Sequence, residues 1–264
     1  MKNLCKLFLL KIYKFPKKRY FYEIMSSFFC KKQFFLQSNM DISFRSTYYN
    51  TNFIKENGGF FIPHDSVNRK IMNLEPWDLV RRDMIILLLR TIVLDEIHGN
   101  LAELGVYKGL TAKLIHHYVP EKKLYLFDSF EGFNVKDLRK EEQETNVKIS
   151  SNLFLDTNVE IVKKNINPVN DNVEFLKGNF PFSITDSLKN ELFSFVHLDA
   201  DLYFPILKGL EFFYPRLSTG GILLIHDYNA WLGARKATDE FFKNKKEKPI
   251  PMPDKSGSAI VLKL

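Results

Sequence analysis

The chain has 264 residues, of which 45% are hydrophobic and 26% are charged. This length and composition predict a globular protein with one α/β domain and an extension, and they exclude a disordered or fibrous chain. The two cysteines, Cys5 and Cys30, both lie near the N-terminus, so no disulfide framework or cysteine-based zinc site is expected in the globular part. The scarcity of cysteine favours a reducing compartment, and we expect a cytoplasmic protein.

The positive charge of the chain is concentrated at its N-terminus. Residues 1–45 contain ten Lys or Arg and two acids, so the rest of the chain is close to neutral although the formal net charge is +7. The high pI therefore does not indicate nucleic-acid binding, and no nucleic-acid partner is expected. No apolar run approaches the roughly 18–20 residues that span a bilayer, and no signal-peptide cleavage pattern follows residues 5–10.

Aromatic and aliphatic residues are interleaved with the basic residues of this tail, as in Phe8, Ile12 and Tyr13 before the basic run 17–19. Two interpretations stay open. Such a segment can lie on an anionic membrane surface, here the inner face of the membrane. It can equally be an extension that is poorly ordered or packs against a partner. The sequence is also compatible with a homo-oligomer.

Along the chain, we expect the extension to fill residues 1–50 and a helical segment to fill residues 51–99. One helix is predicted to begin near Pro76 and to continue to about Ile97, because apolar residues recur there at helical spacing. From residue 100 onward, short apolar runs alternate with helical segments. This alternation predicts a parallel sheet with helices on both faces over residues 100–264.

The predicted strands are Asn100–Leu104, Lys123–Phe127, Val173–Lys177, Phe193–Leu198, Gly221–Ile225 and a closing strand at Ser258–Leu264. Helices are expected at 109–118, 204–214 and 230–245, with one or two more in the polar stretch 131–171. Prolines 249, 251 and 253 predict an edge strand or a turn. In such a sheet the ligand binds beyond the C-terminal ends of the strands, where the strand order reverses.

The first strand ends in a glycine-containing turn. Gly105 and Gly109 follow Glu103 with the spacing Gly-x-x-x-Gly, which differs from the dinucleotide fingerprint and makes a nicotinamide enzyme a poorer fit. Asp128 ends the second strand, where an acid either binds ribose hydroxyls or caps the next helix. The residues after the third strand, 178–180, either face an adenine or form an ordinary turn.

Acids and histidines follow the fourth and fifth strands. Asp199 and Asp201 come after the fourth strand, and His226 and Asp227 come after the fifth. Because both strands end at the same edge of the sheet, Asp199 and Asp227 could share a hard divalent cation such as Mg²⁺. The alternative is that these acids cap helices or accept backbone hydrogen bonds.

Five segments in this order resemble the macrocin O-methyltransferase (TylF/MycF) family over roughly residues 75–245. They are Glu-Leu-Gly-Val-Tyr-Lys-Gly (103–109), Phe-Asp-Ser-Phe-Glu-Gly-Phe (127–133), Leu-Asp-Ala-Asp-Leu-Tyr (198–203), Tyr-Pro-Arg-Leu-Ser-Thr-Gly-Gly (214–221) and His-Asp-Tyr (226–228). The resemblance implies a class I methyltransferase with a doubly wound, mostly parallel seven-stranded Rossmann-like sheet. It also implies S-adenosylmethionine and Mg²⁺ as cofactors, and residues 131–171 as a lid over the acceptor.

The resemblance assigns roles to individual residues. The expected cofactor-binding residues are Glu103, Gly105, Tyr107, Asp128, Ser129, Phe130, Gly178, Asn179 and Phe180. Asp199 and Asp227 match the metal-binding acids, and Asp201 matches the general base. His226 departs from the pattern, because better-known members have an acid there. It could lie behind the metal ligands, favour a softer metal, or act as the base itself.

The function expected from this resemblance is methylation of a sugar hydroxyl on a glycan, glycolipid or glycosylated metabolite. A catechol-like or lipid-linked small acceptor fits the same residues. A non-catalytic, membrane-associated binding module on the same fold is the third hypothesis.

Overall fold

The computed structural model describes residues 78–264. The expectations for residues 1–50, including membrane contact by the basic tail, lie outside the described residues, as does most of the segment 51–99. Within the described part of the chain, no helix combines the length and hydrophobicity needed to cross a membrane.

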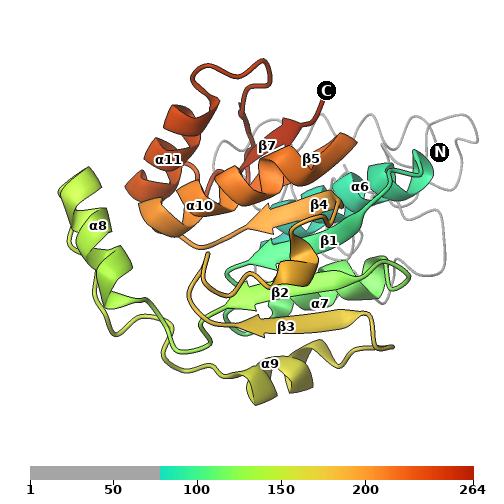
Figure 1. The fold of residues 1–264 in the computed structure, drawn as a ribbon, viewed down its shortest axis with the longest axis horizontal. Helices are drawn as coiled ribbons and strands as arrows, with labels where there is room; N and C mark the ends of the chain where they lie inside the picture. The colour runs from blue at the N-terminus through green and yellow to red at the C-terminus, as the bar shows by residue number, and fades with distance from the viewer. Residues whose placement is uncertain (1–77) are drawn as a thin grey trace, which may run out of the picture. The chain divides into compact units, whose positions relative to one another are not determined.

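A seven-stranded sheet in the order β3-β2-β1-β4-β5-β7-β6 forms the centre of the described residues (Figure 1). The strands are β1 (Asn100–Leu104), β2 (Leu124–Asp128), β3 (Val173–Lys177), β4 (Phe193–Leu198), β5 (Leu217–Ile225), β6 (Ile250–Pro251) and β7 (Ala259–Leu262). The first five are parallel, and β7 runs antiparallel to β5 and β6. The predicted doubly wound, mostly parallel sheet is confirmed. Its strand order reverses between β1 and β4.

Helices cover both faces of this sheet. On one face lie α6 (Leu79–Leu94), α7 (Leu110–Tyr118) and α9 (Val159–Ile166), and on the other lie α8 (Val135–Thr145), α10 (Tyr203–Phe213) and α11 (Leu232–Phe242). Helices α10 and α11 pack side by side, and α8 lies against them beyond the C-terminal ends of the strands (Figure 1). This arrangement places α8 at the edge where a ligand site is expected.

The fifth strand is longer than predicted. It begins at Leu217 rather than Gly221, and the register against β4 shifts between Phe193 and Phe195. Gly220 has a φ of 81°, which only glycine adopts without strain, so the strand bulges at the glycines and still continues. The prediction treated the glycine pair as a strand boundary. The proline-rich segment does form an edge strand, β6, as expected.

Aromatic packing fixes the strand ends in place. The rings of Phe127, Phe180, Phe193 and Phe213 lie between the sheet and α10, with centroids 5.1 to 5.8 Å apart for the contacting pairs. Each is at most 5% exposed. Burial of one such ring stabilises the fold by about 1.5–3 kcal/mol. The residues after β2, β3 and β4 therefore extend from a rigid core.

Candidate active site

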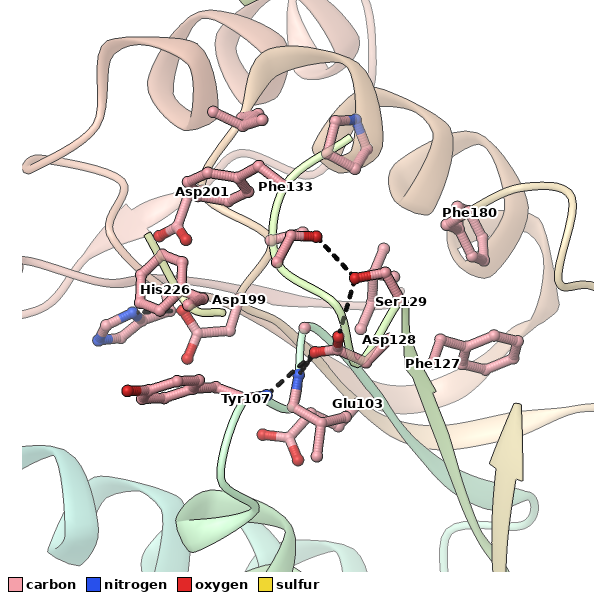
Figure 2. Close-up of a pocket in the computed structure, with 18 of the residues that line it drawn as sticks. Glu103, Tyr107, Phe127, Asp128, Ser129, Phe133, Phe180, Asp199, Asp201 and His226 are labelled. Carbon is pink, nitrogen blue, oxygen red and sulfur yellow. Dashed lines mark hydrogen bonds and ion pairs between the residues drawn. The ribbon is translucent and has the colours of Figure 1, made fainter. Parts of the chain in front are cut away.

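A cavity of about 660 Å³ lies at the C-terminal ends of the parallel strands (Figure 2). Of the residues predicted from the sequence, it is lined by Glu103, Gly105, Tyr107, Asp128, Ser129, Gly178, Asn179, Phe180, Asp199, Asp201, His226 and Asp227. Phe130 does not line it. The Phe130 ring is 1% exposed, and its centroid lies 6.3 Å from that of Phe175. The structure thus brings together every predicted site residue except Phe130.

The turn after β1 packs directly on the backbone that follows β4. Gly105 has a φ of 86°, and a Cβ atom at this position would lie 2.1 Å from the carbonyl oxygen of Asp199. No other residue fits here without moving one of the two loops. The glycine therefore joins the predicted cofactor turn to the predicted metal site.

Asp128 holds this turn through its carboxylate. Its Oδ2 accepts hydrogen bonds from the backbone N–H groups of Val106 at 2.6 Å and Tyr107 at 3.0 Å, and its Oδ1 accepts from Phe130 N–H at 2.6 Å. A carboxylate offers about four acceptor positions, so most of them serve the protein itself. The acid at the end of β2 thus shapes the cavity wall, a role that its position in the sequence did not predict.

Glu103 and His197 form a buried pair on adjacent strands. They are register partners in β1 and β4, and Nδ1 of His197 lies 2.8 Å from Oε1 of Glu103. Burial raises the pKa of Glu103 well above its usual value and lowers the pKa of His197 to about 3, so the imidazole is neutral. Oε2 of Glu103 is buried and makes no hydrogen bond within residues 78–264. An oxygen of this kind in a cavity wall suits a ligand that donates a hydrogen bond.

The acids after β4 and β5 meet around His226. Nδ1 of His226 lies 2.7 Å from Oδ1 of Asp199 and 3.1 Å from Oδ2 of Asp227, and one donor atom from each residue lies within 4.8 Å of the others (Figure 2). Burial raises the pKa of Asp199, but the contact with His226 outweighs it and lowers the pKa below the usual range. Asp199 is therefore ionised at neutral pH.

Asp201 differs from its neighbours in protonation. Burial raises the pKa of Asp201 well above its usual value, and the negative charges of Asp199 and Asp227 raise it further. Asp201 and Asp227 also both have a left-handed backbone, with φ values of 57° and 56°. Such strained conformations cluster at functional sites. A raised pKa makes the ionised form of a carboxylate a stronger base, so Asp201 can accept a proton from a bound hydroxyl once it has lost its own.

Arg81 reaches the same cluster from α6. Its Nη1 lies 2.8 Å from Nε2 of His226. Arginine can only donate, so Nε2 accepts. Burial lowers the pKa of His226, whereas the carboxylates of Asp199 and Asp227 raise it, so Nδ1 keeps its proton and donates to them. The guanidinium of Arg81 opposes a second proton, on Nε2. No sequence signal singles out Arg81, because it precedes the strand region and lies outside the five segments.

The two ionised carboxylates suit a hard divalent cation, which prefers oxygen ligands. The third donor atom of the cluster is Nδ1 of His226, which would first have to release its proton. The residues present therefore fit a cation held by Asp199 and Asp227, with His226 beside them.

Residues after β2 cover the open side of the cavity. The ring of Phe154 packs edge-on against Tyr107 and Phe133, at centroid distances of 5.0 and 5.1 Å. Tyr107 donates a hydrogen bond from its hydroxyl to Asp156 at 2.7 Å, and Lys108 forms an ion pair with the same acid. The segment around residue 154 is thereby fastened to the glycine turn.

Comparison with known proteins matches residues 80–260 to the model of one family, described as macrocin-O-methyltransferase (TylF). A tetracenomycin 4'-O-methyltransferase from Streptomyces olivaceus, whose substrate name includes a dimethoxy-rhamnosyl group, is 30% identical over 57% of this chain. A mycinamicin III 3''-O-methyltransferase from Micromonospora griseorubida is 28% identical over 51% of the chain. The chain spans 60% and 57% of the length of these two relatives.

Solved structures share the fold. The O-methyltransferase NovP has a TM-score of 0.57 at 19% identity, covering 81% of this chain and 88% of its own. A calicheamicin methyltransferase has a TM-score of 0.56 at 16% identity, covering 88% and 90%. Because the family model covers the described domain from α6 to β7, the chain belongs to the macrocin O-methyltransferase (TylF) family.

Proposed function

We propose that this protein is an S-adenosylmethionine-dependent O-methyltransferase that acts on a sugar hydroxyl of a glycan, glycolipid or glycosylated metabolite. One observation carries the proposal. Asp201 lines the same cavity as Asp199, Asp227, the glycine turn and the unpartnered oxygen of Glu103. Two names support a sugar-bearing acceptor. The substrate of the Streptomyces olivaceus relative has a rhamnosyl group in its name, and one protein of similar structure is a TDP-rhamnose 3'-O-methyltransferase.

The residues after β1, β2 and β3 would hold the cofactor. Oε2 of Glu103 would accept hydrogen bonds from the ammonium of its methionine part, and Gly105 lets the backbone come close to it. Asp128 keeps the turn in place, and Ser129 lies beside it. Residues 178–180 would form the wall next to the adenine. S-adenosylmethionine supplies an activated methyl group when bound, so the chain need not activate the donor.

Activation of the acceptor is the task left to the protein, because an alcohol keeps its proton far above neutral pH. Asp201, in its ionised form, would accept the hydroxyl proton as general base. Asp199 and Asp227 would hold a divalent cation, Mg²⁺ by preference, which lowers the pKa of a bound hydroxyl. His226 would donate from Nδ1 to Asp199 and Asp227 and so orient both carboxylates.

A methyl-transfer screen tests this function. Nucleotide-linked and lipid-linked sugars and a catechol would be offered with labelled cofactor, with Mg²⁺ added or chelated. We expect turnover of a sugar, and a loss of at least about 100-fold in kcat for Asp201→Asn because the base is gone. Glu211→Gln, an exposed acid on α10, is the control and should keep full activity.

Two results would overturn the proposal. Turnover of the catechol and of no sugar would favour the small-acceptor alternative. If calorimetry detected binding of neither S-adenosylmethionine nor its demethylated product, the non-catalytic binding module would be favoured instead.

We further propose that residues 1–45 attach the enzyme to an anionic surface at the inner face of the membrane, on the basis of their ten basic and two acidic residues. Co-sedimentation with anionic vesicles, with and without this segment, tests the attachment. Equal partitioning of the two forms would end the idea.

A further inference from the structure

The covering helix α8 is anchored at its middle by a buried acid. Glu141 is 1% exposed, and its Oε2 accepts a hydrogen bond at 2.7 Å from the backbone N–H of Tyr203, the first residue of α10. The same carboxylate accepts from the backbone N–H of Gly233 in the first turn of α11. Glu141 thus fixes which face of α8 is turned toward α10 and α11.

Asp137 lies one helical turn before Glu141, so it projects from the same face of α8. It lines the cavity, as do Leu202 and Pro205 at the start of α10. Within the described part of the chain, its carboxylate makes no hydrogen bond or ion pair. The nearby Lys140 forms no ion pair with Asp137, because its ammonium lies over the ring of Phe204, 3.1 Å from the centroid.

The Asp137 carboxyl group is half-buried in the cavity wall and has no hydrogen-bond partner among the described residues. Burial raises the pKa of Asp137 to about 6, although the charge of Lys140 lowers it. A half-buried carboxylate without a hydrogen-bond partner costs free energy, so such groups in a cavity wall are expected to meet a ligand that donates hydrogen bonds. Glu141, by contrast, already satisfies its oxygens with the two helices.

Two aromatic rings line the same cavity as this acid. Phe133, four residues before Asp137, points into the cavity near Asp201, and Phe154 packs against it (Figure 2). A pyranose ring presents C–H groups on its faces and hydroxyls at its rim. An aromatic surface and an unpartnered carboxylate in one cavity match both kinds of group, whereas a catechol has only one hydroxyl besides the one that is methylated.

We propose that Asp137 determines acceptor specificity, its carboxylate accepting hydrogen bonds from sugar hydroxyls next to the one that is methylated, while Phe133 and Phe154 contact the apolar face of the sugar. This inference rests on the proposed function, and it assigns acceptor contacts within the segment 131–171. Asp137 positions the acceptor and takes no proton from it. That task stays with Asp201.

Steady-state kinetics with the best sugar from the screen test the inference. We expect Asp137→Ala to raise the KM for the acceptor by about tenfold or more with kcat changed less than about threefold, because a binding contact is lost and the base remains. Asp137→Asn should raise the KM less than Asp137→Ala does, since the amide oxygen still accepts a hydrogen bond. Glu142→Gln, an exposed acid on the same helix, is the matched control.

Deoxygenated acceptors identify the contact. Removal of the hydroxyl that Asp137 binds should raise the KM of the unaltered enzyme as much as Asp137→Ala does. The same removal should leave the KM of the Asp137→Ala variant unchanged. An unchanged KM in Asp137→Ala, or independent losses from the two changes, would overturn the inference. A preference for an amino sugar over its hydroxyl counterpart would also overturn it, since the partner would then be an ammonium group.

Calorimetry with S-adenosylhomocysteine separates the two proposals. If the protein binds this product but Asp137→Ala leaves the KM for the acceptor unchanged, only the specificity proposal fails. If the product does not bind the unaltered protein, the proposed function fails.

Discussion

Removal of the Glu141 carboxylate should release α8 from the rest of the domain. In Glu141→Ala, the backbone N–H groups of Tyr203 and Gly233 lose a charged acceptor, and both lie at helix N-termini, where a negative charge is stabilising. Hydrogen bonds to charged groups contribute about 1.5–3 kcal/mol each. Burial raises the pKa of Glu141, so the cost of desolvating the carboxylate offsets part of the free energy of these hydrogen bonds.

The expected net loss is about 2–4 kcal/mol, which corresponds to roughly a 30- to 900-fold increase in the open population of α8. Hydrogen exchange of residues 135–145 measures this opening directly. The sheet strands should keep their protection, because the aromatic core around Phe127 and Phe213 is untouched. Glu142→Ala removes an exposed acid from the same helix and should leave exchange unchanged.

A second substitution checks the cause. A Cβ atom at Gly233 would lie 2.1 Å from Oε2 of Glu141, so Gly233→Ala should also open α8. In the Glu141→Ala background, the methyl group of Gly233→Ala enters the space that the carboxylate vacated, so it should change the stability of α8 little. Equal cost in both backgrounds would refute the reasoning, because the carboxylate would then not be what holds the helix.

Four further predictions concern residues in the cavity and behind its wall. Gly105→Ala should abolish product binding in calorimetry and destabilise the fold by more than about 2 kcal/mol, since its Cβ would overlap the carbonyl oxygen of Asp199 at a φ of 86°. His226→Asp should tighten Mn²⁺ binding by about tenfold, or about 1.4 kcal/mol, in a fluorescence or electron-resonance titration, because a hydrogen-bond donor becomes an oxygen ligand. The His197 ring should show no NMR titration between about pH 5 and 8, given its pKa of about 3. Glu103→Gln removes the acid that takes up a proton on folding. In this variant the free energy of unfolding should fall as the pH drops below about 6.5, because the His197 imidazole is then protonated in the unfolded chain but still neutral in the folded protein.

The parallel sheet and most of the site could be predicted because they depend on local patterns and one topological rule. Each strand is a short apolar run, and parallel strands bring their C-terminal ends to one edge. Asp199 and Asp227 therefore had to lie close together once their strands were recognised. The bulge in β5 was missed, because a glycine pair at a strand start looks the same whether pairing ends or continues.

Contacts that depend on helix orientation could not be predicted. Arg81 and His226 are 145 residues apart, and their contact requires α6 to present one particular face at the site. The partners of Asp128 are backbone amides, which carry no signal in the side-chain pattern. Asp137 and Glu141 look like ordinary acids of a polar helix, and only the packing of α8 on α10 and α11 distinguishes them.

A histidine rather than an acid at position 226 changes the charge of the site. With an acid there, three carboxylates would face one another, and a bound cation or an added proton would have to relieve their repulsion. Here the proton on Nδ1 of His226 already lies between Asp199 and Asp227, and Arg81 adds a fixed positive charge behind the ring. The two carboxylates can thus stay ionised without a metal, so a divalent cation gains less on binding than it would in an all-acid site. Chelation should accordingly reduce the proposed activity of this protein less than that of the His226→Asp variant. A complete and equal loss in both would show that the His226 proton and Arg81 do not substitute for any of the cation's charge.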